Sequence, residues 1–377
     1  MTTTTVSELN IIELSDIHLG HKGTPTISIL KGLYRLLRDT PSATNVDMIV
    51  LAGDVFDREL TFPDDDLLLI RKWIHDLLLF CKKHDIVLRV LEGTPSHDWK
   101  QSFEFEHINE QFKIGVDVKH VRLLYIEHID SLNIDVLYVP DEWRTDNSQT
   151  WLEVQELMAQ KGLDKVDFAI MHGAFPHQMP DEASKWMQFH NPDNYLSIVR
   201  YHIFVGHIHR YSQYDRILSA GSFDRLAHGE EGEKGYLYYT LHSNGKCSIR
   251  FIVNRDSTIY KTIDLRNKVL DECLDLVIEI VNSYTEESHV RLWIERSEGL
   301  SQLLLTLRRM YPNFIWTTKV TEANSSKNES SLSMVVYRPI QSLTTETLPT
   351  AVIERLKTDY PQYLDICTEL LKRTMFS

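Results

Sequence analysis

The chain has 377 residues and 42% hydrophobic content, which predicts two or three domains with large cores and excludes a disordered chain. No apolar stretch approaches the roughly 20 residues needed to span a bilayer, so no membrane association is expected. The formal net charge of −14 argues against holding nucleic acid by general electrostatics, and it predicts weak, salt-sensitive DNA affinity without excluding nucleic acid as a substrate.

Strand and helix patterns alternate over roughly the first 210 residues. Short apolar runs that end in polar residues or glycine predict strands, and apolar residues at three- and four-residue spacing predict helices. The predicted strands are residues 10–14, 48–52, 86–91, 121–126, 135–139, 166–171 and 201–205, and the predicted helices are 27–37, 67–78 and 151–160. Shorter strand patterns follow at 216–220, 236–241 and 247–253. This order predicts a layered α/β domain whose sheet is parallel early and antiparallel late.

The pattern changes near residue 256. Beyond it we expect a small α+β module with a helix at 270–283, a strand at 289–294, a helix at 300–311, and two strands around the polar tract 324–331. Two further helices, at 348–358 and 363–375, are predicted to end the chain. The predicted parts are therefore residues 1–256, 257–340 and 341–377.

Five of the predicted strands end in aspartate, histidine, serine or glycine. These ends are Asp16-Ile17-His18, Gly53-Asp54-Val55-Phe56-Asp57, Gly93-Thr94-Pro95-Ser96-His97-Asp98, Met171-His172-Gly173 and Gly206-His207-Ile208-His209. Ligand crevices of α/β sheets lie at the carboxyl ends of strands, so these side chains are expected to converge. Carboxylates and imidazoles suit borderline divalent ions such as Mn²⁺, with Fe²⁺ or Zn²⁺ as alternatives. The ordered set is typical of a two-metal phosphoesterase.

Two ions about 3.5–4 Å apart share a bridging carboxylate, and Asp54 is the candidate for that bridge. The remaining predicted ligands of the first ion are Asp16, His18 and His209. The second ion is predicted to bind His172 and His207, with Ser96 or a water at a further position.

His97 is the predicted contact to the scissile phosphate, as general acid or charge stabiliser. Asp98 follows it directly and is expected to orient it through a hydrogen bond. Asp57, which ends the second motif, is a further catalytic candidate. Any one of these residues alone could be a polar loop residue or a helix cap, but that reading does not account for the ordered set.

The ordered motifs resemble the calcineurin-like metallophosphoesterases. Finer features look like the SbcD nucleases, the bacterial and phage relatives of the meiotic-recombination-eleven subunit of double-strand-break repair. These features are Ser15 to Gly20, Ala52 to Asp57, Ser219 to Arg225 and Gly229 to Tyr236. The resemblance covers about residues 10 to 240.

The resemblance implies a four-layer β-sandwich flanked by helices for residues 1–256, a DNA-capping domain for 257–340, and an ATPase-binding helical segment for 341–377. The implied activity is Mn²⁺-dependent 3′→5′ exonuclease on double-stranded DNA, with endonuclease activity on single strands or hairpins. An SbcC-type coiled-coil ATPase is the implied partner, and a homodimer is expected. The four cysteines follow no C-x-x-C spacing, which favours a reducing cytoplasm as the location of the protein. If the chain is phage-encoded, this would be the cytoplasm of the host.

The third motif departs from the family pattern Gly-Asn-His-Asp, in which the asparagine is a metal ligand. It is two residues longer here, and Ser96 is taken to stand in the asparagine position. Asp57 stands where eukaryotic relatives often carry histidine and SbcD proteins carry aspartate. Two alternatives stay open: a phosphodiesterase or phosphatase for a smaller substrate, and an inactive scaffold that recruits the ATPase.

Overall fold

The computed structural model describes residues 8–40, 45–141, 146–182, 187–268, 270–285, 287–295 and 300–321. The chain divides into two compact units, residues 1–322 and 323–377. The second unit lies outside the described residues, and with it lie the helical segment predicted for 341–377 and the strand predicted beyond the tract 324–331.

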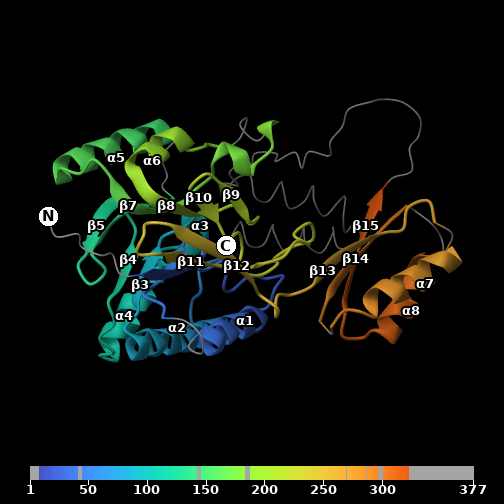
Figure 1. The fold of residues 1–377 in the computed structure, drawn as a ribbon. Coiled ribbons are helices and arrows are strands. Elements are labelled where there is room, and N and C mark those ends of the chain that lie inside the picture. The colour runs from blue at the N-terminus through green and yellow to red at the C-terminus, as the bar shows by residue number, and fades with distance from the viewer. Residues whose placement is uncertain are drawn as a thin grey trace, which may run out of the picture. The chain divides into compact units, whose positions relative to one another are not determined.

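Two six-stranded sheets form the larger part of the first unit (Figure 1). The first sheet has the order β12 (Cys247–Val253), β11 (Gly235–Leu241), β1 (Leu9–Leu14), β2 (Met48–Ala52), β3 (Val87–Leu91) and β4 (Val118–Val121). The second has the order β5 (Tyr125–Ile129), β6 (Ile134–Val139), β7 (Val166–His172), β8 (Val199–Gly206), β10 (Ile217–Ser219) and β9 (Ser212–Tyr214). In each sheet the central strands are parallel and the antiparallel pairs lie toward the edges.

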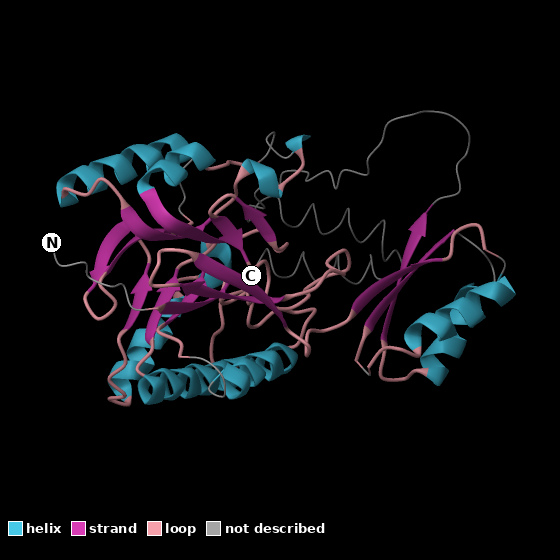
Figure 2. Ribbon diagram, viewed as in Figure 1, coloured by secondary structure: helices cyan, strands magenta, loops and turns pink. Residues whose placement is uncertain are grey.

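Helices cover the outer face of each sheet (Figure 2). Helices α1 (Thr26–Asp39), α2 (Asp65–His84) and α4 (Glu104–Gln111) pack on the first sheet, and α5 (Asn147–Lys161) and α6 (Pro192–Ile198) pack on the second. Alternation along β1 sends Ile12 toward the helices and Ile11 toward the second sheet. Three apolar cores therefore separate four layers, which confirms the predicted fold class. Strands such as β2 and β7 are buried along their whole length because both faces are covered.

The layers correct two details of the sequence analysis. The antiparallel pair β5–β6 comes in the middle of the chain and belongs to the second sheet, so the strands do not form one sheet that is parallel early and antiparallel late. The strand predicted at 121–126 is also wrong, because β4 ends at Val121 and β5 begins at Tyr125 in the other sheet. Leu123 lies at this crossing and is 69% exposed. A mainly apolar run such as residues 121–126 does not reveal that the chain changes sheets.

A three-stranded module follows β12, and the predicted boundary at residue 256 lies between β12 and the first strand of this module. Its strands β13 (Tyr260–Asp264), β14 (His289–Glu295) and β15 (Ile315–Thr321) are parallel and alternate with α7 (Leu270–Val281) and α8 (Leu300–Met310). Both helices pack on one face of this sheet, where Val277 and Leu307 meet Leu292. No helix in the described part of the chain is long and apolar enough to cross a membrane.

Candidate metal centre

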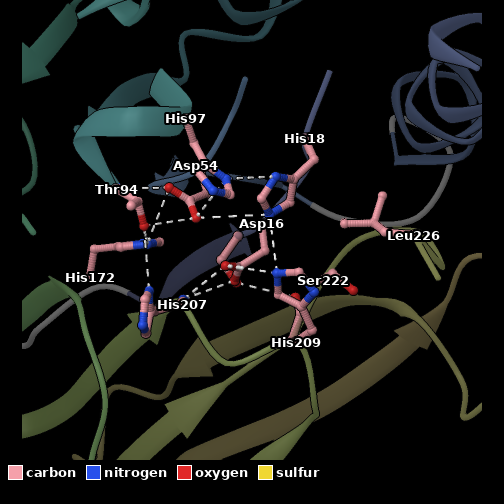
Figure 3. A network of polar contacts seen from close by, with 12 residues as sticks. Asp16, His18, Asp54, Thr94, His97, His172, His207, His209, Ser222 and Leu226 are labelled. Carbon is pink, nitrogen blue, oxygen red and sulfur yellow. Dashed lines mark hydrogen bonds and ion pairs between the residues drawn. The ribbon is translucent and has the colours of Figure 1, made fainter. Parts of the chain in front are cut away.

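The five predicted motifs meet at the carboxyl ends of the central strands of both sheets (Figure 3). Asp16 follows β1 and Asp54 follows β2, and the Asp16 amide donates to the carbonyl of Gly53. His172 ends β7 and His207 follows β8 in the other sheet. The His207 amide donates to both carboxylate oxygens of Asp16, at 2.9 and 3.1 Å. Hydrogen bonds between the two sheets thus hold the site together.

The backbone of this site is strained. Asp16, His18, Asp54 and His207 all have positive φ, with values of 50°, 54°, 50° and 103°. Non-glycine residues rarely adopt this region, at a cost of roughly 1–3 kcal/mol each. A Cβ atom on Gly53 would lie 2.2 Å from His172 Nδ1, so only glycine allows β2 and β7 to approach this closely. Such strain persists at sites where function holds side chains in one geometry.

The first cluster comprises Asp16, His18 and His209. His18 Nε2 lies 3.1 Å from His209 Nε2, and that atom lies 3.8 Å from Asp16 Oδ1. Asp57 accepts a hydrogen bond from His18 Nδ1 at 3.1 Å, and Glu230 accepts one from His209 Nδ1 at 2.9 Å. Because each Nδ1 donates to a carboxylate, each ring turns its Nε2 toward the cluster, which is how a metal-binding histidine is oriented.

Glu230 was missed by the sequence analysis, which singled out Gly229 to Tyr236 only as a point of resemblance. Its carboxylate lies 2.9 Å from Lys234 Nζ, and Lys234 also donates to the carbonyl of His209 and the hydroxyl of Ser222. Burial alone would raise the pKa of Glu230, but the hydrogen bond from His209 and the charge of Lys234 lower it to about 2. Glu230 is therefore a carboxylate at neutral pH and holds the His209 ring in place.

The second cluster comprises Asp54, His172 and His207. His172 Nδ1 donates to the carbonyl of Ala52 at 2.8 Å, and Nε2 lies 3.4 Å from Asp54 Oδ1. The hydroxyl of Thr94 lies 3.1 Å from Asp54 Oδ2 and 3.5 Å from both His172 Nε2 and His207 Nδ1. The second histidine pair thus faces a carboxylate and a neutral hydroxyl oxygen.

Asp54 lies between the two clusters. Its Oδ1 faces His172, while its Oδ2 lies 3.8 Å from His18 Nε2 and 3.6 Å from His97 Nδ1. Burial alone would raise the pKa of Asp54, but His172 and His18 lower it far below its usual range. An ionised carboxylate with one oxygen toward each cluster has the geometry that two ions sharing a ligand require.

The electrostatics of the site favour positive charge. Burial opposes protonation of His172, yet the negative charges of Asp54 and Asp16 raise its pKa to about 10. The site therefore takes up a proton when no other cation balances these carboxylates. Carboxylate oxygens and imidazole nitrogens within 4.8 Å of one another in each cluster fit two borderline divalent ions.

The third motif forms the short helix α3 (Pro95–Asp98). His97 lies at the edge of the site with its side chain 35% exposed, and its Nδ1 is 3.2 Å from His18 Nδ1. Ser96 was expected to reach the metals, but it is exposed and its carbonyl accepts from the indole of Trp99. Thr94, directly after Gly93, places its hydroxyl in the site instead. Counting the motif from its glycine rather than from His97 identifies Thr94.

Asp98 does not contact His97 as the sequence analysis expected. It is fully buried, and its carboxylate accepts hydrogen bonds from the backbone amides of Asp54, Phe56 and Gly93, at 3.1, 2.9 and 2.7 Å. Asp98 thus joins the second and third motifs through their backbones and fixes the position of Asp54.

Two carboxylate–histidine clusters with Asp54 between them lie at the carboxyl ends of two stacked sheets, and this arrangement fits a metal-dependent phosphoesterase. The model of the calcineurin-like phosphoesterase family matches residues 9–211, more than half of the chain, and the chain belongs to this family. No curated protein matches it. Among solved structures, TT1561 of Thermus thermophilus is 12% identical with a TM-score of 0.39, over 66% of this chain and all of that one. A second solved structure is 10% identical to this chain with a TM-score of 0.38, and the match covers 65% of this chain and all of that one.

Proposed function

We propose that the chain is an SbcD-like nuclease subunit that hydrolyses phosphodiester bonds in DNA with two divalent ions, Mn²⁺ being the expected metal. The proposed substrates are duplex ends, cleaved 3′→5′, and single strands or hairpins, cleaved internally. An SbcC-type coiled-coil ATPase is the proposed partner of a homodimer. The observation that carries the proposal is the position of Asp54 between two ligand clusters, with His97 beside it.

The roles of the residues follow from this arrangement. Asp16, His18 and His209 would hold the first ion, His172 and His207 would hold the second with help from Thr94, and Asp54 would contact both. When bound, two such ions supply an activated water and neutralise charge on the phosphate. His97 lies beside Asp54 with its side chain 35% exposed, and it can donate a hydrogen bond or proton to a phosphate or leaving-group oxygen.

The three-stranded module supports DNA as the substrate. On the face of its sheet opposite the helices, the guanidinium carbon of Arg266 and Nζ of Lys319 lie 3.4 and 4.0 Å from the centre of the Trp293 ring. Cations beside an aromatic ring are typical of surfaces that hold a nucleic-acid strand. A small-molecule hydrolase does not need such a surface.

The second candidate is a hydrolase of smaller phosphodiesters, and the net charge of −14 favours it because that charge repels a DNA backbone. An assay separates the two. Protein loaded with Mn²⁺ is incubated with linear duplex, single-stranded and hairpin DNA and with a simple nucleotide diester, with and without the ATPase. Cleavage of DNA is expected, with duplex cleavage increased by the ATPase and ATP. Cleavage of the diester alone would support the second candidate, and ATPase binding without any cleavage would support a scaffold.

A further inference from the structure

A groove begins at the first cluster and extends away from it, and neither the ligand clusters nor His97 account for it. Its volume is about 970 Å³, and the residues that line it include His209, Arg210, Tyr211, Glu230, Phe251 and Val253. His209 and its hydrogen-bond partner Glu230 belong to both the groove and the candidate metal centre. A ligand in the groove would therefore contact residues of the centre.

The wall of the groove is aromatic and apolar. The ring of Tyr211 lies 5.0 Å from that of Phe251, and Tyr211 is 39% exposed. Val253 extends this wall and is 37% exposed. Exposed aromatic faces bind nucleobases by stacking, with little dependence on base identity.

The charged residues that line the groove are of both signs, Arg210 and Lys234 against Glu230 and Glu233. Arg210 is exposed, and no described residue pairs with its guanidinium, so it is available to a phosphate. Lys234 is not available in this way, because it is buried and donates to the His209 carbonyl and to Ser222. Glu233 also lines the groove and disfavours a phosphate there, which leaves the aromatic wall to the uncharged base.

The groove is held open by its backbone. A Cβ atom on Gly221 would lie 2.8 Å from backbone atoms of His209, Arg210 and Tyr211, so this segment packs directly on Gly221. Gly232 lines the groove, and a Cβ atom there would meet only open space. A preformed site of this volume suits a small ligand or a few nucleotides.

We propose that this groove binds the nucleobase next to the scissile phosphate, stacked on Tyr211. The inference rests on the proposed function and deepens it, because it names the substrate feature that the centre selects. A base within a duplex has both faces covered by its neighbours, so only an unpaired base can stack on the ring. The substrate class is therefore nucleic acid with an unpaired base at the cleavage position.

The test compares a short single-stranded oligonucleotide with one of the same length built from abasic residues, each assayed with Mn²⁺. The wild-type chain is expected to have a KM for the base-bearing oligonucleotide roughly 5- to 150-fold below that for the abasic one, the range of base–aromatic stacking. Tyr211→Ala should bring this ratio close to one, and Tyr211→Phe should retain it because the ring remains. Tyr214→Ala is the matched control, since Tyr214 is 45% exposed but does not line the groove.

Each outcome separates the groove from the wider proposal. A ratio that Tyr211→Ala leaves unchanged, or a wild-type ratio near one, would overturn the groove assignment while leaving the nuclease proposal intact. Hydrolysis of neither oligonucleotide by the wild-type chain would overturn the nuclease proposal itself. In that case, equal binding of the two oligonucleotides measured by fluorescence anisotropy would also overturn the groove assignment, and tighter binding of the base-bearing one would support it.

Discussion

The two ligand clusters differ in what holds their histidines. Asp57 and Glu230 accept the Nδ1 protons of His18 and His209 in the first cluster, whereas His172 in the second donates to the carbonyl of Ala52. Burial does not separate the clusters, because each has two buried members and one half-buried member. A carboxylate partner makes an imidazole a stronger ligand and adds negative charge. The first cluster is therefore expected to bind its ion more tightly than the second.

The largest expected effect comes from Asp54, the carboxylate that lies between the two clusters. Asp54→Asn keeps the shape of the side chain but removes the charge that both ions would need. Turnover should fall by more than the roughly 10- to 100-fold that loss of an outer partner causes. Phosphodiester hydrolysis measures the loss, and circular dichroism checks that the fold is intact. Retained activity in a folded variant would contradict the two-metal assignment.

His97 belongs to neither of the two clusters but forms a third potential ligand group with His18 and Asp57, so its removal tests whether rate and metal binding can be separated. His97→Ala should lower kcat by roughly 10²- to 10⁴-fold, the usual contribution of a positioned acid or base. Calorimetric titration with Mn²⁺ should still detect two ions. If an ion is lost together with the rate, His97 is a ligand and the assignment of the phosphate contact is wrong.

Glu230→Gln tests why the first cluster should bind more tightly. The amide cannot accept the Nδ1 proton of His209 as strongly, so affinity for the first ion should fall by roughly 10- to 100-fold. Glu231→Gln is the matched control, because Glu231 pairs with Lys261 and the Thr262 amide instead. Equal titration curves for the two variants would show that Glu230 does not support His209.

The second cluster should depend on pH through His172. In the metal-free chain its pKa is raised to about 10, so at neutral pH the ring carries a proton that an ion must displace. Binding of the ion to His172 therefore releases this proton. Affinity for the second ion should therefore rise with pH, by up to about tenfold per unit. Calorimetry in two buffers with different ionisation enthalpies measures the released proton, and its absence would contradict this account.

The smallest effects concern the third motif. Thr94→Val removes the hydroxyl beside His172 and His207 and should weaken the second site by roughly twofold to tenfold, the value of about one hydrogen bond. Ser96→Ala should be close to neutral, because Ser96 is exposed. Manganese titration of activity measures both. A larger loss of manganese affinity for Ser96→Ala than for Thr94→Val would show that Ser96, and not Thr94, contributes to the second site.

The sequence by itself was enough to predict that Asp16, His18, Asp54, His172, His207 and His209 converge, because this depends on a local property, but it did not identify Thr94 or Glu230. Parallel strands end at the same edge of a sheet, so motifs placed at strand ends must meet there. Helices α1, α2 and α5 were predictable for a similar reason, since helical periodicity is visible along a single segment.

The tertiary structure alone decided the contacts between distant segments. Asp98 accepts from the amides of Asp54 and Phe56, 44 and 42 residues away, and Glu230 supports His209 across 21 residues. The residue spacing within a single motif does not indicate contacts between residues so far apart in the chain. Tertiary structure also decides that Thr94, and not the predicted Ser96, contributes the hydroxyl. Pro95 begins α3, and the fold around Asp54 determines which hydroxyl faces the centre. Only the packing of two sheets, with glycine where β2 approaches His172, brings these segments together.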